Sequence, residues 1–281
     1  MQHLFPLPGI PCKWRPFRRL RRTISLCLLA WCVLLPTIAL ADIVVTLPPL
    51  AGLVSMLDPS VRVHCLLPPA GDPHTFQLTP RQAAQLKKAD LLIRASRDDG
   101  GWPGLDTGIP ILDLWPKTNH AWLQPKEVQK ALPRLAARLQ ELDPEHRSQI
   151  GAALNTAIKL CHRMELAWHH ALKPFKSAGV IMQHPAWRGL CEHFDIPVHA
   201  VLEPRHHGGE VTPRKLEQTL RLIRAHPATA LWGDNRHSNR ALIWLMRHGH
   251  TSKPVILDAL GTCGMRWEAL MEHNIALLEK P

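Results

Sequence analysis

Short apolar runs alternate with helix-length segments along this chain, in two series that flank one long stretch without a strong helix breaker. Each run is short, apolar and bounded by proline or polar residues, which favours strands. The alternation of strand and helix is typical of parallel sheets covered by helices. The expected strands lie at 43–47, 61–67, 91–93 and 111–114 in the first series, and at 180–182, 198–202, 229–232 and 255–257 in the second.

The stretch between the two series predicts a single long helix. Asp143-Pro144-Glu145 is a helix start signal, with Asp143 as N-cap and proline at the first helical position. From there to Lys173 only Gly151 weakens the helix, so about 29 residues would span about 43 Å. We therefore predict an α/β protein of two parallel-sheet lobes joined by one long helix. The expected division is 1–41 signal peptide, 42–142 N-terminal lobe, 143–174 connecting helix and 175–281 C-terminal lobe.

The N-terminus has the three parts of an export signal. A basic segment comes first, an apolar run at 24–38 follows, and Ala39-Leu40-Ala41 fits the small-x-small cleavage pattern. The mature chain is then expected to begin at Asp42 in the periplasm. An uncleaved leader that anchors the chain in the membrane is the alternative, because about 20 apolar residues can span a bilayer.

Charge argues against nucleic acid as a partner. The leader carries six of the 34 Lys and Arg residues, which leaves a net charge of +5 on the mature chain. No Lys/Arg run remains that would favour nucleic acid, and we expect a monomer.

Four cysteines remain beyond the leader: Cys65, Cys161, Cys191 and Cys263. An oxidising compartment allows disulfides, but the three possible pairings stay open.

Three histidines and one aspartate stand out as candidate metal ligands. They occur in Asp72-Pro73-His74, Asn119-His120-Ala121-Trp122, Gln183-His184-Pro185 and Leu257-Asp258-Ala259. His74, His184 and Asp258 follow expected strands, and ligands bind beyond the carboxyl ends of strands in open α/β sheets. Three imidazoles and a carboxylate are a complete ligand set for tetrahedral zinc. We therefore expect His74, His120, His184 and Asp258 to meet in a cleft between the lobes.

Seventeen of the 18 histidines lie beyond the leader, so most of them are expected at the surface. His169 and His170 are neighbours on the long helix and do not share a face. His206 and His207 lie in a glycine-flanked loop, where a solvated pair or a weak accessory site is expected. His237, His248 and His250 are expected in loops and at helix ends.

The ligand set separates two functional classes. Three imidazoles favour zinc over manganese, which prefers more oxygen ligands. If Asp258 fills the fourth position, a carrier follows; if a water fills it, a zinc hydrolase becomes possible. The sequence contains no HExxH motif and no nucleophile elbow, so we expect no enzyme. A metal carrier or adhesin without a transporter is a further alternative.

The motifs together resemble the metal-binding receptors of ABC importers, the cluster A-I solute-binding proteins for zinc and manganese. The resemblance runs along nearly the whole mature chain, through Leu67-Pro68-Pro69-Ala70-Gly71-Asp72-Pro73-His74, Asn119-His120-Ala121-Trp122-Leu123, His184-Pro185-Ala186-Trp187 and Leu257-Asp258-Ala259-Leu260-Gly261. It implies two α/β lobes bridged by a long helix, with little hinge motion. It also implies that His74, His120, His184 and Asp258 bind the metal ion, and that an inner-membrane ABC permease receives it.

Overall fold

The computed structural model describes residues 41–96, 99, 101–203, 211–249 and 252–280. The expected leader, apart from its last residue, lies outside this part of the chain, as do His206, His207 and His250. Within the described ranges, no helix is long and apolar enough to cross a membrane.

The first lobe is built on a four-stranded parallel sheet with the order β2-β1-β3-β4. The helix α3 starts with a capping box, in which Thr79 and Gln82 satisfy each other's free backbone N–H groups. The helix α2 starts at Pro48. Proline is well tolerated at a first helical position, because the N–H that it lacks would have no partner within the helix. The elements are β1 (Asp42–Val45), α2 (Pro48–Leu57), β2 (Arg62–Cys65), α3 (Pro80–Leu86), β3 (Leu91–Arg94) and β4 (Ile111–Asp113).

The second lobe repeats this architecture with the order β6-β5-β7-β8, again all parallel. All eight strands expected from the sequence are present, so the predicted fold class is confirmed. The elements are α7 (Phe175–Ala178), β5 (Val180–Met182), α8 (Arg188–His193), β6 (Val198–Val201), α9 (Pro213–Ala225), β7 (Ala230–Asp234), α10 (Arg240–Gly249) and β8 (Val255–Leu257).

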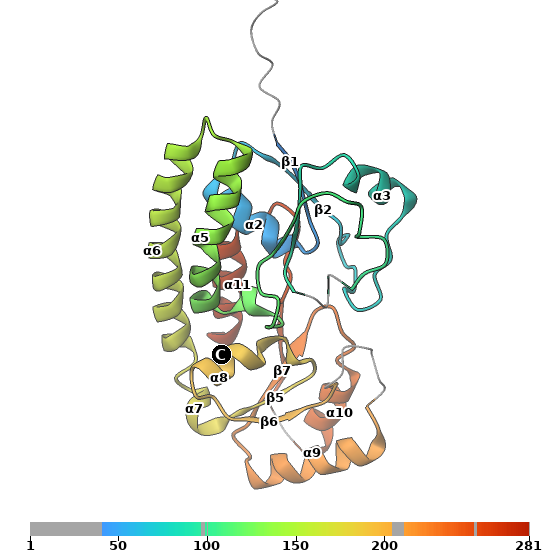
Figure 1. Ribbon diagram of the computed structural model, residues 1–281. Coiled ribbons are helices and arrows are strands. Elements are labelled where there is room, and N and C mark those ends of the chain that lie inside the picture. Colours follow the sequence, from blue (N-terminus) through green and yellow to red (C-terminus); the bar gives the residue numbers. More distant parts are fainter. Residues whose placement is uncertain (1–40, 97–98, 100, 204–210, 250–251, 281) are drawn as a thin grey trace, which may run out of the picture. The chain divides into compact units, whose positions relative to one another are not determined.

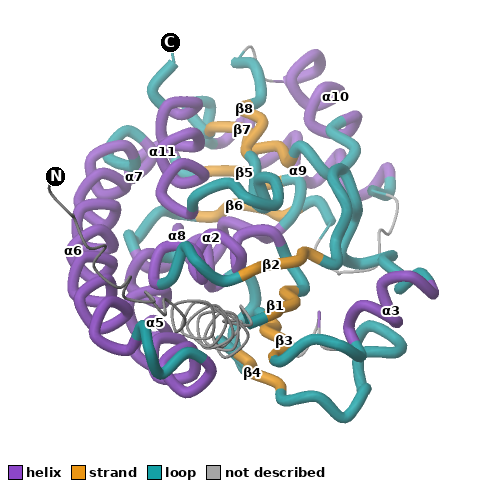
Figure 2. Tube along the Cα trace, turned by 90° about the horizontal axis from the view of Figure 1, so that it is seen from above, coloured by secondary structure: helices purple, strands orange, loops and turns teal. Residues whose placement is uncertain are grey.

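Three helices pack together along one side of both sheets: α5 (Pro125–Leu142), α6 (Arg147–Ala171) and α11 (Trp267–Leu278). Figure 2 shows them on one side, with α3, α9 and α10 on the other. The connecting helix α6 begins at Arg147 rather than near Pro144. Asp143 instead ends α5, and its carboxylate accepts hydrogen bonds from the backbone and ring of His146. The chain thus turns between two antiparallel helices before α6 begins.

One large hydrophobic core runs through both lobes, and a smaller one lies within the second lobe around Ile181 and Ile223. The closing helix α11 belongs to the second half of the chain but packs against α2 of the first lobe (Figure 1). The approach is close, because a Cβ added at Gly52 would lie 2.7 Å from the Met265 carbonyl oxygen and the Trp267 nitrogen. Gly52 therefore lets α2 and α11 meet.

Two tryptophans and a disulfide tie the lobes together. Trp122 donates its indole N–H to the Ala259 carbonyl at 2.7 Å, and Trp267 donates to the Trp122 carbonyl at 2.7 Å. Cys65, at the end of β2, is bridged to Cys263 across 198 residues of sequence. These bonds link the loops that lead to the expected site.

The other two cysteines expected in the mature chain are not bridged. Cys161 and Cys191 are free thiols, and both are buried. Burial raises the pKa of each thiol, so the reactive thiolate is disfavoured. They therefore act as core residues.

Candidate metal centre

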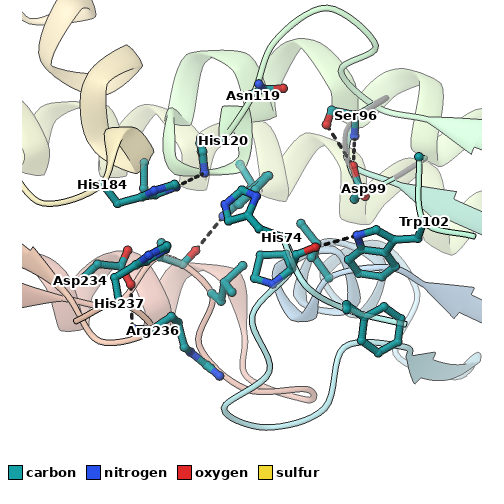
Figure 3. Close-up of a pocket in the computed structure, with 18 of the residues that line it drawn as sticks. His74, Ser96, Asp99, Trp102, Asn119, His120, His184, Asp234, Arg236 and His237 are labelled. Carbon is teal, nitrogen blue, oxygen red and sulfur yellow. Dashed lines mark hydrogen bonds between the residues drawn. The ribbon is translucent and has the colours of Figure 1, made fainter. Parts of the chain in front are cut away.

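A cavity of about 440 Å³ lies between the loops that leave the two sheets. The first lobe contributes His74 and His120 to its wall, and the second contributes His184 and His237. Figure 3 shows these imidazoles gathered around one part of the cavity. Side chains that are more than 100 residues apart in sequence are thus brought together by the fold.

His74 is held in the loop that follows β2. The carboxylate of Asp72 accepts the backbone N–H of His74 at 2.9 Å, which closes a tight turn. The indole of Trp102 donates to the Pro73 carbonyl at 2.8 Å and holds the same turn from the cavity side. Asp72 and Pro73, the two residues that precede His74, are thus both held in place.

His120 has a left-handed backbone conformation, with φ of 54°. It immediately precedes a short 3-10 helix, Ala121–Leu123, and its carbonyl accepts the N–H of Leu123 at 3.0 Å. A left-handed conformation is costly for a residue with a Cβ, and such residues gather at functional sites. The buried Trp122 that follows anchors the strained turn through its bond to Ala259.

His184 stands at the end of β5 with an extended backbone and is only 5% exposed. A 3-10 helix, Pro185–Trp187, begins directly after it. Its Nε2 lies 3.4 Å from Nε2 of His120, which belongs to the other lobe. This contact brings imidazole nitrogens of the two lobes together.

Asp258 follows β8 and organises a turn. Its Oδ1 accepts the backbone N–H groups of Leu260 at 3.0 Å and Gly261 at 2.8 Å. Asn274 on α11 holds the backbone of Asp258 through both its N–H and its carbonyl. Among the residues that the structure describes, the cavity wall includes Ala259 and Leu260 but not Asp258. The charge of Asp258 is nonetheless close to the site, because it adds to the larger effect of burial in raising the pKa of Asp234.

His237 is a site residue that the sequence analysis treated as an ordinary loop residue. Ligand atoms of His74, His184 and His237 all lie within 4.8 Å of one another. The rings of His184 and His237 are stacked, with centroids 4.2 Å apart and planes 12° apart. One signal could have revealed it: Asp234-Asn235-Arg236-His237 is a polar cluster directly after an apolar strand, as at His184.

Carboxylates surround His237. Burial disfavours its charged form, but a hydrogen bond with Glu203 and the charge of Asp234 outweigh burial and raise its pKa. Its Nδ1 lies 3.3 Å from Oε2 of Glu203. The second lobe thus supplies negative charge beside the imidazoles.

The donor set fits a divalent metal ion of borderline softness. Zinc–imidazole bonds of about 2.0–2.1 Å in a tetrahedron place two ligand nitrogens about 3.3 Å apart. The nitrogens of His120 and His184 are already 3.4 Å apart. An ion between them would match this spacing and bridge the two lobes.

Comparison with known proteins identifies the family. Residues 43–102 and 117–280 match the family described as "ZnuA: Zinc-uptake complex component A periplasmic". The chain belongs to this family. Its members are non-enzymatic metal receptors of the solute-binding type, which confirms the predicted resemblance and the absence of an enzymatic role.

Individual relatives agree with this placement. A protein of Thermotoga maritima described as metal-binding is 28% identical over 256 residues, which cover 85% of this chain and 91% of the relative. A crystal structure of ZnuA superposes with a TM-score of 0.75 at 22% identity, covering 85% of this chain and 98% of that one. The solute-binding protein FpvC of Pseudomonas aeruginosa, in complex with Ni²⁺, superposes with a TM-score of 0.71 at 19% identity, covering 85% and 95%. At these identities the structures show a shared fold.

Proposed function

We propose that this protein is a periplasmic receptor that captures a zinc ion between its lobes and delivers it to an inner-membrane ABC permease. The observation that carries the proposal is the approach of His120 and His184 from different lobes to 3.4 Å. The ion is the transported substrate, and the receptor binds it without changing it chemically.

The proposed ligands are the three histidines expected from the sequence, His74, His120 and His184. Asp258 is the carboxylate candidate for the fourth position, as the sequence motif implies. Two ligands from each lobe would make ion binding depend on the relative position of the lobes. The shared core and the disulfide support a receptor in which that position changes little.

Zinc is proposed over manganese because the site is rich in imidazole. Nitrogen ligands suit zinc, copper and nickel, whereas manganese favours carboxylate, carbonyl and water oxygens. Proteins of this fold have been seen with different ions: FpvC with Ni²⁺ and with Mn²⁺, and a periplasmic protein of Candidatus Liberibacter asiaticus with Mn²⁺. The choice of metal therefore depends on the ligands of this chain and not on the fold.

The cellular setting is part of the proposal. The leader-like segment at 1–41, periplasmic family membership and a disulfide fit an exported chain. We propose cleavage before Asp42, the lobe and helix boundaries expected from the sequence, and a monomer that binds no nucleic acid. The permease would recognise the face that holds the loops around the cavity.

The decisive experiment is a metal titration of the mature chain against a chromogenic chelator. We expect one zinc ion per chain and much weaker binding of manganese. Loss of the central imidazole in His184→Ala should weaken zinc binding by more than about a hundredfold, beyond the loss typical of residues that only support a ligand. His170→Gln, at an exposed position of α6, is the matched control and should bind zinc as the wild type does.

Two results would contradict this proposal. One is unchanged zinc affinity in His184→Ala, and the other is tighter binding of manganese than of zinc. Zinc affinity should also fall below about pH 6, because imidazoles bind metal only when neutral and have an ordinary pKa of about 6.5.

A further inference from the structure

His237 forms a cluster with His74 and His184 whose ligand atoms could hold a metal ion, and His120 approaches this cluster through His184. Its ligand atom lies within 4.8 Å of those of His74 and His184. A tetrahedral zinc site needs nitrogen separations of about 3.3 Å, so these separations would have to shorten by up to about 1.5 Å. The stacked rings of His184 and His237 would also have to turn toward one ion, which side-chain rotation allows.

The hydrogen bonds of His237 orient it as metal-binding histidines usually are. Its Nδ1 faces Oε2 of Glu203 at 3.3 Å, and this leaves Nε2 for a ligand. Glu203 is itself held, because Gln183 donates an amide N–H to its Oε1 at 2.7 Å. Gln183 directly precedes His184, so one chain of contacts positions two neighbouring imidazoles.

The loop that carries His237 is rigidly built. The side chain of Asn239 accepts the N–H of Asp234 at 3.1 Å and donates to the Asp234 carbonyl at 2.9 Å. It also donates to the His237 carbonyl at 3.2 Å. Gly233 makes room for it, because a Cβ there would lie 2.4 Å from the Asn239 oxygen. His237 is therefore held beside the cavity by its own backbone.

The carboxylate of Asp258 already takes part in a backbone turn. Its Oδ1 is shared by two backbone N–H groups of the turn that forms part of the cavity wall. Only Oδ2 is then left for a metal ion, and among the described residues Asp258 is neither in the cavity wall nor in the group of close ligand atoms that includes His237.

We propose that His237 is a direct ligand of the transported ion, beside His74, His120 and His184, and that Glu203 is its positioning residue. The inference rests on the proposed function, since it assigns the fourth contact of the same site to His237 in place of Asp258, the carboxylate candidate that the sequence motif implies. Four neutral imidazoles favour zinc, nickel and copper over manganese. Asp258 then contributes charge and holds the turn.

The test compares three single variants for zinc affinity and for the visible absorption of bound Co²⁺, which reports coordination geometry. His237→Ala should weaken zinc binding about tenfold or more and change the Co²⁺ spectrum, because a water would replace an imidazole. Glu203→Gln should weaken binding by about tenfold, typical of a residue that supports a ligand. Asp258→Asn should have a smaller effect than His237→Ala, and His170→Gln should match the wild type.

The outcomes separate this inference from the proposed function. If His184→Ala abolishes tight binding while His237→Ala leaves affinity and spectrum unchanged, the receptor stands and His237 is no ligand. A larger loss in Asp258→Asn than in His237→Ala would also overturn the inference. If His237→Ala fails to fold, side-chain nitrogen NMR of the wild type decides: zinc should shift the Nε2 resonance of His237, and an unshifted resonance would refute its role.

Discussion

The two lobes have the same strand order but use their equivalent crevices differently. In each sheet the connections leave in opposite directions from the first and third strands, β1 and β3 in one lobe and β5 and β7 in the other. Ligands of open α/β sheets bind at this switch point, beyond the carboxyl ends of those strands. Both crevices border the cavity, so the comparison concerns the side chains placed at the same position of one architecture.

The first crevice is filled by its own hydrogen bonds. Asp99 is 5% exposed and accepts the Ala95 and Ser96 backbone N–H groups at 2.8 and 2.6 Å. The Thr46 and Ser96 hydroxyls donate to it as well. The second crevice instead presents His184, whose Nε2 lies 3.4 Å from that of His120 in the other lobe, and His237, whose Nδ1 faces Glu203 of its own lobe. Topology thus determines where a site can lie, and side chains determine whether that place is closed or binds a metal ion.

The largest effect is expected from removing the disulfide bond between the lobes. Replacing Cys65 and Cys263 by serine removes a crosslink across 198 residues, which chain-entropy arguments value at about 5 kcal/mol of unfolding free energy. Thermal and denaturant unfolding of the double variant measure the loss. Unchanged stability would show that the noncovalent core alone joins the lobes.

A substitution in the first crevice should lower the free energy of unfolding and leave metal binding largely unchanged. Asp99→Asn replaces one acceptor oxygen by a donor among several buried donors, and should cost about 3 kcal/mol of unfolding free energy. Zinc affinity should change far less than in His184→Ala, for which we expect a large loss of zinc affinity and a smaller loss of stability. Denaturant unfolding and metal titration of both variants measure the contrast, with Asp106→Asn at an exposed position as control. If Asp99→Asn lost zinc instead, the two crevices would share one role.

A smaller effect is expected where the lobes meet at Trp122. Trp122→Phe removes the indole donor to Ala259 and leaves that carbonyl unpaired, at a cost of about 2 kcal/mol. The unfolding midpoint of this variant should fall below that of Trp244→Phe, a partly buried tryptophan on α10. Equal midpoints would argue that the indole bond adds nothing to packing between the lobes.

The smallest effect concerns the turn between α5 and α6. Pairing with Asp143 raises the pKa of His146, and the same pair lowers that of Asp143 despite the opposing effect of burial. The His146 contribution is therefore present below its unfolded pKa of about 6.5 and lost as pH rises through its folded value. His146→Ala should lower the melting temperature more at pH 5.5 than at pH 8.5. An equal difference at both pH values would contradict the pairing.

Much of the fold could be predicted because its signals are local. The apolar runs at 91–93 and 255–257 and the Thr79-Pro80 helix start depend on neighbouring residues, and each appears at the expected place. The connecting helix starts later than expected, because the side chain of Asp143 binds the turn that follows α5 and does not cap α6.

The sequence by itself determined the two α/β series, the helix between them and the loops that carry His74, His120, His184 and Asp258. Strand order and packing decided the rest: which cysteines pair, that α11 crosses to α2, and that His237 joins the histidines. These facts depend on contacts between residues far apart in sequence. A local pattern can mark the loop that carries His237 but not the contact itself, because the contact forms only when both sheets have folded and their carboxyl ends face the same cavity.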